Sequence, residues 1–341
     1  MLELLNTLYV QTQGVTLHLE GDTVRVSQKG ETITRVPLLR LQGIVVFGNV
    51  MVTPLLLHRC AQDGRLLAWF SYHGRFRGRL HGPTSGNVLL RRAQHNALSD
   101  AGQTHHIARQ VVAAKIQNAR HTLLRAAREA DETEDEAALR AAAAHLAVVL
   151  RRLPSLNDLN DLRGAEGEAA RTYFTVFSHM VRVDRAHFAL DGRTRRPPRD
   201  PMNALLSFLY ALLCAQCEAA LEGVGLDPQV GYLHTLRSGR PALALDLMEE
   251  LRPVLADRVA LTLVNRRQLQ ARHFEGEHAI RLTDEGRRIL LNAYEERKAA
   301  EVPHALLRQK LPLGLVPHIQ ARLLARYLRG DIATYPPFLY R

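Results

Sequence analysis

The sequence is poor in cysteine and in aromatic residues, and it has no long hydrophobic run. Its 341 residues include three cysteines and one tryptophan, and aromatic residues make up 6% of the chain. So few cysteines argue against a framework of disulfide bridges. No stretch approaches the roughly 18 uninterrupted apolar residues of a spanning helix, and the N-terminal Met-Leu-Glu-Leu-Leu-Asn lacks the basic start of a signal peptide. We therefore expect a cytoplasmic protein that does not enter a membrane.

Two of the cysteines, Cys214 and Cys217, have the C-x-x-C spacing that occurs in zinc sites. They lie inside the apolar run 205–221, and no second Cys or His pair is nearby. Packing inside a buried helix therefore explains them better than zinc does.

Positive charge and apolar residues are plentiful. The chain has 45 Lys and Arg against 34 Asp and Glu, a net charge of +11, and 46% of its residues are hydrophobic. Such a composition excludes a disordered chain, and the length allows about two domains. The basic balance favours a polyanionic partner, either nucleic acid or an acidic membrane surface, although many basic proteins use such charge only for solubility.

The hydrophobic pattern divides the chain near residue 84 and predicts an α+β protein. A small β-rich N-terminal domain, residues 1–83, precedes a larger all-α C-terminal domain, residues 84–341. In the first part the pattern predicts a hairpin over 15–26, a buried strand over 44–47, a helix between Thr53 and Gly64, and a strand over 66–70.

The second part has mostly helical periodicity. Thr133 and Glu136 have capping-box spacing, Pro154 opens the helix that carries Glu166, and 260–264 with 275–281 could form a small strand pair. The other predicted helices cover 105–129, 202–221, 241–256, 284–299 and 303–328.

Three separated segments of this second part carry candidate metal ligands. Glu166 lies in Gly-Ala-Glu-Gly, His234 in Gly-Tyr-Leu-His, and Glu249 in Leu-Asp-Leu-Met-Glu. Two carboxylates and an imidazole in apolar surroundings are a suitable donor set for a divalent cation. In a strongly basic chain, the natural substrate of such a site is a phosphodiester.

Each signal alone has a simpler explanation. Glu166 could be an exposed helix residue, with Gly164 and Gly167 beside it to let another helix or a ligand approach. His234 could be a hydrogen-bonded surface or core residue. Asp246 and Glu249 are three residues apart, so they share the helix face on which any amphipathic helix would place charges.

Together, the three segments resemble the signature of the CRISPR-associated spacer integrase, the Cas-one endonuclease of the adaptation module. In that family a Gly-x-Glu-Gly helix, a Gly-x-x-His turn and a Leu-Asp-x-x-Glu/Asp helix supply three metal ligands. The resemblance implies that Glu166, His234 and Glu249 bind the metal and are the catalytic residues, and that Asp246 supports them. It covers nearly the whole chain, including the β-then-α order.

Two further segments carry the resemblance. The stretch 195–207 is similar to the family's Arg/Pro-rich approach to its central helix, and the opening 4–10 is similar to members from subtype I-C. The resemblance implies a homodimer that binds double-stranded DNA. It also implies a small ferredoxin-like second adaptation protein that holds two dimers together, in a complex that inserts a short duplex into a repeat array.

The expected reaction is attack of a DNA 3′-hydroxyl on a phosphodiester. It requires charge neutralisation at the phosphate and a more nucleophilic attacking oxygen, and Mn²⁺ or Mg²⁺ held by two carboxylates and one imidazole supplies both. The imidazole favours Mn²⁺.

Basic side chains near these segments are candidates for DNA contacts, although each could be a solvated charge. Tyr173, seven residues after Glu166, could stack near the scissile phosphate or could belong to the core. The candidates are Arg163, Arg171, Tyr173, Arg195, Arg196, Arg237 and Arg240.

Two other functions remain open. One is a general metal-dependent nuclease for branched or damaged DNA, which would use the same site without an integration partner. The other is a non-catalytic nucleic-acid scaffold, in which the carboxylates are only surface charge.

Overall fold

The computed structural model describes residues 7–41, 43–72, 76–80, 82, 88–190, 192–194 and 197–340. The chain forms two compact units, Met1–Gly86 and Asn87–Arg341. Mixed α and β structure, with strands concentrated in the first unit and helices in the second, confirms the predicted fold class in its main feature.

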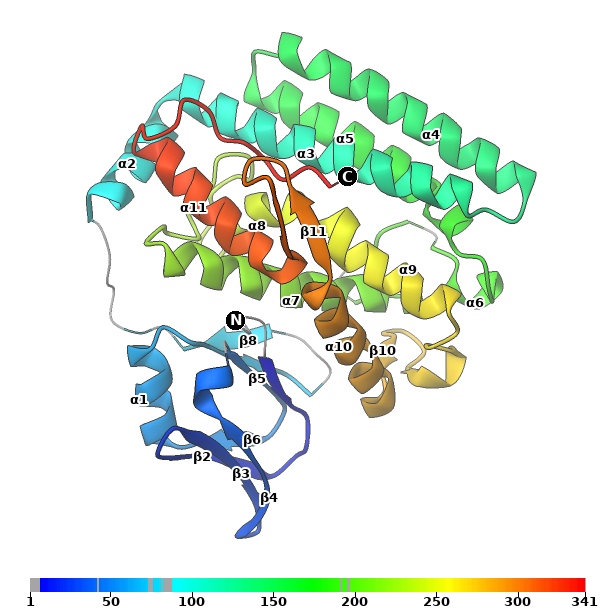
Figure 1. Ribbon diagram of the computed structural model, residues 1–341. Helices are drawn as coiled ribbons and strands as arrows, with labels where there is room; N and C mark the ends of the chain where they lie inside the picture. The colour runs from blue at the N-terminus through cyan, green and yellow to red at the C-terminus, as the bar shows by residue number, and fades with distance from the viewer. Residues whose placement is uncertain are drawn as a thin grey trace. The chain divides into compact units, whose positions relative to one another are not determined.

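Within its described residues, the N-terminal unit consists of two four-stranded sheets and one α-helix (Figure 1). In the first sheet, β1, β5 and β7 are parallel and β8 is antiparallel to β7. The second sheet has the order β4-β3-β2-β6. The elements are β1 (Thr7–Val10), β2 (Val15–Glu20), β3 (Thr23–Gln28), β4 (Glu31–Pro37), β5 (Gly43–Phe47), β6 (Val50–Val52), α1 (Pro54–Gln62), β7 (Leu66–Phe70) and β8 (Phe76–Arg79).

The local predictions for this unit are confirmed. β2 and β3 form the expected hairpin around Gly21, whose positive φ of 56° suits the tight turn. Every residue of β5 is buried, as its continuous apolar sequence predicts. The helix α1 begins at Pro54, and Gly64 follows its end with a φ of 63°.

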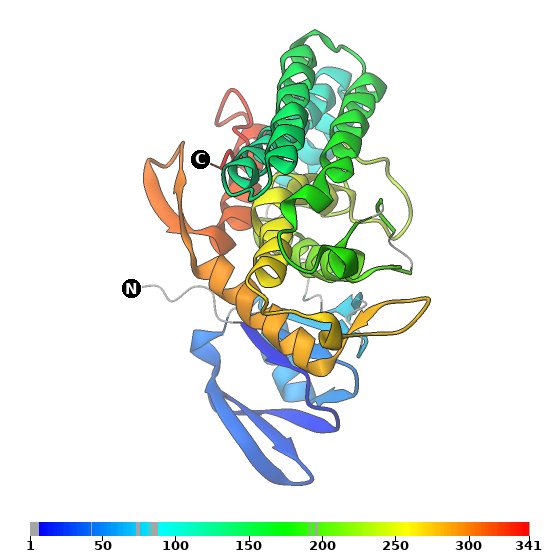
Figure 2. The same cartoon turned by 90° about the vertical axis from the view of Figure 1, so that its right-hand side faces the viewer.

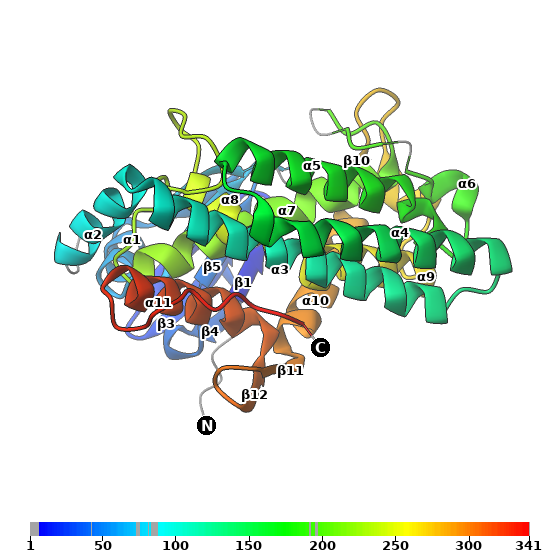
Figure 3. The same cartoon turned by 90° about the horizontal axis from the view of Figure 1, so that it is seen from above.

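The C-terminal unit is mostly helical. In Figure 1 and Figure 3, α3, α4 and α5 pack side by side, and α7 runs through the middle of the unit below them. The helices are α2 (Val88–Ser99), α3 (Ala101–Arg128), α4 (Thr133–Arg152), α5 (Leu159–Thr175), α6 (Arg185–Phe188), α7 (Pro201–Gly223), α8 (Ala242–Glu249), α9 (Arg258–Asn265), α10 (Asp284–Ala299) and α11 (Val316–Leu328).

The apolar helix α7 forms the centre of this unit and contains the helix predicted over 202–221. Asp200 caps its N-terminus by accepting a hydrogen bond of 2.7 Å from the backbone N–H of Asn203, and Pro201 occupies the first turn. By length and hydropathy α7 could cross a membrane, but 72% of its most apolar window is buried inside the unit. It is therefore the core helix of this unit.

The C-terminal unit is not all-α, and this part of the prediction is wrong. Two short hairpins interrupt the helices: β9 (Phe274–Glu275) with β10 (Arg281–Leu282), and β11 (Glu301–His304) with β12 (Gln309–Pro312). The second hairpin projects from the helices in Figure 2. Two of its positions are prolines, which a helix interior does not accommodate, so the helix predicted over 303–328 begins only at Val316.

Other boundaries also differ. The segment 260–264, predicted as a strand, lies in α9, where core packing of its apolar face outweighs the strand preference of its β-branched residues. Glu132 rather than Thr133 precedes the first turn of α4, so the predicted capping box is absent from this helix. Pro154 lies in a short 3-10 turn, and α5 begins after Asp158, whose carboxylate accepts the Asn160 N–H at 2.8 Å.

Candidate metal centre

Four elements of the C-terminal unit bring charged side chains together. Glu166 comes from α5, Glu249 from the last turn of α8, and His234 from the loop between α7 and α8. The fourth contributor is Lys115 on α3, which packs against both α5 and α8. The three predicted ligands therefore share one cluster although they are far apart in the sequence.

Asp246 fixes the position of His234. This carboxylate is 1% exposed and accepts the backbone N–H groups of Tyr232, Leu233 and His234 at 2.7, 3.0 and 3.0 Å. Its Oδ1 also lies 2.7 Å from His234 Nδ1. A carboxylate at Nδ1 makes that nitrogen the donor, and Nε2 is then an acceptor available to a metal ion.

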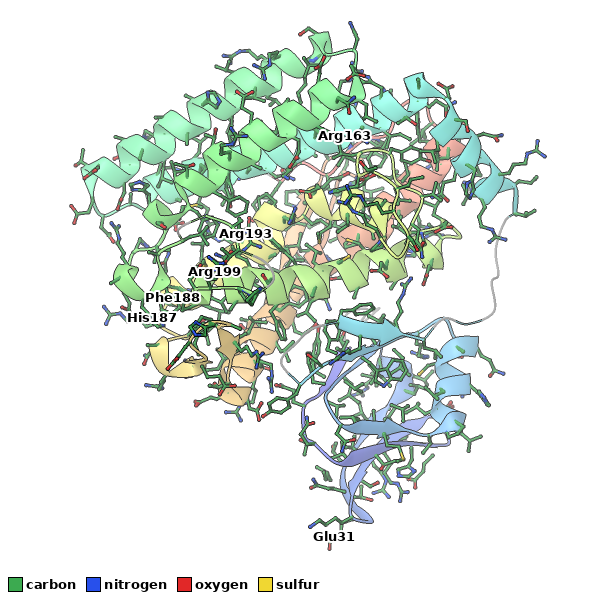
Figure 4. The ribbon with its side chains drawn as sticks, turned by 180° about the vertical axis from the view of Figure 1, so that it is seen from behind. Glu31, Arg163, His187, Phe188, Arg193 and Arg199 are labelled. Atoms are coloured by element: carbon green, nitrogen blue, oxygen red, sulfur yellow. The ribbon has the colours of Figure 1, made fainter. Side chains whose placement is uncertain are left out.

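Two further residues hold the His234 loop against the helices. A Cβ at Gly231 would lie 2.5 Å from the carbonyl carbon of Ala242, so only glycine lets the loop approach the start of α8 this closely. Arg163, which lies beside the loop in Figure 4, donates through Nε to the Leu233 carbonyl at 2.8 Å. At least part of its guanidinium is therefore used to position the loop.

Lys115 lies between the two glutamates. Its Nζ is 2.7 Å from Glu249 Oε2 and also forms an ion pair with Glu166 Oε1. The Nε2 of His234 is 3.9 Å from Glu249 Oε1. Glu249 is 2% exposed, so its negative charge depends on these neighbours.

Arg252 is the second cation at Glu249. It lies in a π-helical segment, Arg252–Asp257, and its Nη1 is 2.5 Å from Glu249 Oε1. Burial alone would raise the pKa of Glu249, but Arg252, Lys115 and His234 outweigh it and hold this pKa at about 2. The carboxylate is therefore ionised at neutral pH.

A buried network of one cation–π contact and two hydrogen bonds holds Arg252 in place. Its guanidinium lies 4.2 Å from the centre of the Tyr210 ring, a cation–π contact, and the Tyr210 hydroxyl donates to Asp257 Oδ1 at 2.6 Å. Tyr173 donates to the other carboxylate oxygen of Asp257 at 3.1 Å. Burial raises the pKa of Asp257 to about 6, although both tyrosines and Arg252 act in the opposite direction.

Tyr173 is thus a core residue, and the prediction that it contacts DNA is wrong. The side chain is 3% exposed, and its hydroxyl is already engaged by Asp257. Seven-residue spacing from Glu166 does not make Tyr173 accessible, because Tyr173 lies beside Ile116 and Ala119 of α3.

The other predicted DNA contacts remain predictions. Arg171 and Arg237 are exposed. Arg240 is partly exposed and donates to the Thr235 carbonyl at 3.5 Å. The two remaining arginines lie outside the described residues; they are Arg195 and Arg196.

The donor set fits a divalent cation, but the ligands do not yet surround a common point. Within the described residues, no three carboxylate, imidazole or thiol groups meet closely enough to bind one ion, and the Lys115 ammonium lies between the glutamates. Glu249 Oε2 nevertheless receives no hydrogen bond of normal geometry, even from Lys115. A buried carboxylate oxygen with charge nearby but no directional partner is a suitable ligand atom.

The surface beside Glu166 is open. No heavy atom of the described residues lies within 4 Å of where a Cβ would stand at Gly164 or Gly167, setting aside chain neighbours and the backbone of their own helix. Of the two approaches expected at these glycines, that of another helix is not seen among the described residues, and the space is available to a ligand.

Sequence reasoning missed Lys115 and Arg252. Lys115 is a single cation within the apolar run Val-Val-Ala-Ala-Lys-Ile of the helix predicted over 105–129, and this was the available signal. Arg252 lies three residues after Glu249, a spacing at which two side chains on a helix can pair.

A family model described as CRISPR associated protein Cas1 matches residues 8–296. The chain is 55% identical over 340 residues to CRISPR-associated endonuclease Cas1 1 of Moorella thermoacetica, which covers 99% of each sequence. It is 49% identical over 347 residues to CRISPR-associated endonuclease Cas1 2 of Rhodospirillum rubrum, over 100% of each.

Solved structures have the same fold. A Cas1 protein from Thermotoga maritima has a TM-score of 0.80 at 25% identity, over 95% of this chain and 97% of that one. A casposase bound to an integration product has a TM-score of 0.82 at 21% identity, over 98% and 94% of the two chains. A chain of a Cas6-RT-Cas1–Cas2 complex has a TM-score of 0.81 at 23% identity, and the match covers 98% of this chain and 36% of that one.

Proposed function

Since the chain belongs to the Cas1 family of CRISPR-associated endonucleases, we propose that it inserts short DNA fragments into a CRISPR array by a divalent-metal-dependent reaction. The proposed step is a transesterification, in which the fragment's 3′-hydroxyl attacks a phosphodiester of the array, forms a new phosphodiester bond and displaces the 3′-oxygen of the array strand, which leaves as a free 3′-hydroxyl. The observation that carries this proposal is the cluster of Glu166, His234 and Glu249, oriented by Asp246 and Arg252.

The side chains divide the work. Glu166 and Glu249 supply carboxylate oxygens, and His234 supplies Nε2 while Asp246 holds its Nδ1 proton. When bound, Mn²⁺ or Mg²⁺ would neutralise phosphate charge and make the attacking hydroxyl more nucleophilic, and the imidazole favours Mn²⁺. Arg252 keeps Glu249 ionised and aimed at the site.

The DNA itself provides the nucleophile in this proposal, so the protein has to position two strands. Arg171 on α5 and Arg237 on the His234 loop are exposed, and their guanidinium groups are suited to phosphate binding. The open surface at Gly164 and Gly167 gives the scissile phosphate access to Glu166.

The proposed assembly is a homodimer that acts on double-stranded DNA with a small ferredoxin-like second adaptation protein. A solved relative forms a Cas1–Cas2 complex, and another Cas1 has been crystallised with DNA, which supports both kinds of partner. We place this activity in the cytoplasm and assign the protein to a subtype I-C system.

A strand-joining assay tests the proposal. A labelled duplex with a free 3′-hydroxyl and a second that ends in a dideoxynucleotide are each incubated with the protein, Mn²⁺ and a plasmid that carries a CRISPR array. We expect joined product only from the 3′-hydroxyl duplex, and more of it when the second adaptation protein is added. Nicking of branched DNA with no joined product under any condition would favour a general repair nuclease.

Glu166 and Glu168 provide a matched pair of variants on the same helix. Glu166→Gln should abolish joining because a metal ligand is lost, whereas Glu168→Gln should retain it because the Glu168 carboxylate pairs with Arg152 and His145. Full joining activity of Glu166→Gln would contradict the assignment of Glu166 as a metal ligand. A non-catalytic scaffold would give no joined product with the wild type or with either variant.

A further inference from the structure

A basic hollow lies on the C-terminal unit, separate from the metal centre. It is bounded by α11, by the end of α7 and by the β11–β12 hairpin, and its volume is about 580 Å³. It shares no lining residue with the metal centre, and α11 and α5 lie on opposite sides of α3 in Figure 2 and Figure 3. The lining residues are Gly223, Val224, Leu307, His318, Ile319, Arg322, Leu323, Ala325, Arg326 and Arg329.

The polar residues of this hollow form a stripe along α11. Its positive charge comes from the arginines, because burial and the nearby Arg322 lower the pKa of His318. His318, Arg322 and Arg326 follow one another at four-residue intervals on α11, so they share one face with a rise of about 6 Å from one to the next. All three are exposed, and none of the described lining residues is acidic.

Two arginines of the hollow, Arg322 and Arg326, have no ion-pair partner among the described residues. Among the residues that the structure describes, neither Arg322 nor Arg326 forms an ion pair with a carboxylate, whereas Arg329 pairs with Asp331 at 2.6 Å. Their guanidinium groups are therefore available, and the planar fork of guanidinium matches the oxygens of a phosphate.

The remaining lining is apolar. Leu307 and Ile319 present aliphatic surface beside the arginines, and Leu307 is 39% exposed. A volume of about 580 Å³ lies within the usual range of about 300–1,000 Å³ for pockets that bind one small ligand. Such a hollow admits an unstacked nucleotide, whereas the bases of a duplex are shielded inside their stack.

We propose that this hollow, the α11 site, binds single-stranded DNA, with Arg322 and Arg326 on successive phosphates and a base against Leu307 and Ile319. Sequence-independent recognition of single strands commonly combines a basic track with surfaces for the base faces. An acidic protein segment would use the charges but would gain less from the apolar hollow. The site is independent of the metal ligands, and its binding needs no divalent ion.

The test measures binding of the full chain to a fluorescein-labelled oligothymidylate by anisotropy, in EDTA and at several salt concentrations. We expect Arg322→Gln/Arg326→Gln to bind about tenfold more weakly or worse. The salt dependence should also fall by about 1.4 in log–log slope, since each single-strand phosphate contact contributes about 0.7.

The matched control is Arg151→Gln/Arg288→Gln, which removes the same charge from exposed positions on α4 and α10. It should change affinity far less. Leu307→Glu, which places a carboxylate in the hollow without removing an arginine, should weaken binding as well. Metal-dependent joining or nicking measured in parallel reports on the metal centre separately.

Three results would overturn the inference. Equal losses in the test and control variants would show that only net charge matters. Unchanged binding by Leu307→Glu would show that the hollow is not occupied. Competition by polyglutamate as effective as that by unlabelled oligothymidylate of equal charge would identify an acidic protein segment as the ligand instead.

Discussion

Replacing Lys115 by methionine should lower the folding stability of the metal-free protein and raise its affinity for a divalent metal ion. Lys115 holds the two glutamates together through its ammonium group, 2.7 Å from Glu249 Oε2 and paired with Glu166. A divalent ion bound by the same carboxylates has to displace this ammonium. Methionine keeps a similar length of apolar side chain but removes the competing charge.

The size of the stability loss depends on how well the charges of Glu249 and Glu166 are still compensated once Lys115 is removed. Removing one partner of a buried ion pair costs about 3–5 kcal/mol when the other charge is left alone. Glu249 retains Arg252 at 2.5 Å, and the Glu166 side chain is 26% exposed, so both keep part of their stabilisation. We therefore expect a loss of about 2–3 kcal/mol, which lowers the Tm of a unit of this size by roughly 4–12 °C.

Calorimetry with and without Mn²⁺ measures both effects. The variant should bind Mn²⁺ about tenfold more tightly, a difference of about 1.4 kcal/mol, and its Tm should rise more on adding Mn²⁺ than that of the wild type. Lys298→Met is the control, because Lys298 is also buried and paired, with Glu295 at 2.7 Å. It should lose stability without a change in Mn²⁺ affinity. Equal or weaker Mn²⁺ binding by Lys115→Met would refute the reasoning.

Three further changes test the supporting structure. Asn118→Ala should lower the free energy of unfolding by about 1–3 kcal/mol in urea titrations and make the C-terminal segment protease-sensitive. The reason is that the side-chain amide of Asn118 donates hydrogen bonds to the carbonyls of Glu250 and Phe338 at 2.7 and 2.9 Å. Tyr210→Leu should reduce Mn²⁺ affinity in calorimetry while Tyr210→Phe retains it, since the phenyl ring preserves the cation–π contact with Arg252. The folded pKa of Asp257 is about 6, above its ordinary 3.8, so the stability it contributes is present below pH 3.8 and is lost as pH rises through 6. Denaturation at several pH values should show that Asp257→Asn lacks this component of about 3 kcal/mol.

The sequence was sufficient where one local signal determined the outcome. β5 and α7 were predictable because continuous apolar runs of strand and helix length have to be buried. The segment 303–328 was not, because its helical periodicity does not show that the part before Val316 pairs as the β11–β12 hairpin. The strand predicted over 260–264 failed because packing of α9 against the core outweighs local preference.

The candidate site was predictable only in part. Motif resemblance pointed to Glu166, His234 and Glu249, but it could not show what compensates their charges. Lys115 reaches the cluster from a different helix, far away in the sequence, and such a contact exists only in the folded chain. Tyr173 illustrates the opposite case, because helical spacing placed it near the site and burial against Asp257 removed it from the surface.

The most direct test of the metal centre is anomalous diffraction from crystals of the protein soaked in Mn²⁺. We predict one strong peak bonded to Glu166, Glu249 and His234 Nε2, with Asp246 still on His234 Nδ1 and the Lys115 ammonium withdrawn from between the glutamates. No peak at saturating Mn²⁺, with Lys115 still bridging Glu166 and Glu249, would contradict the account.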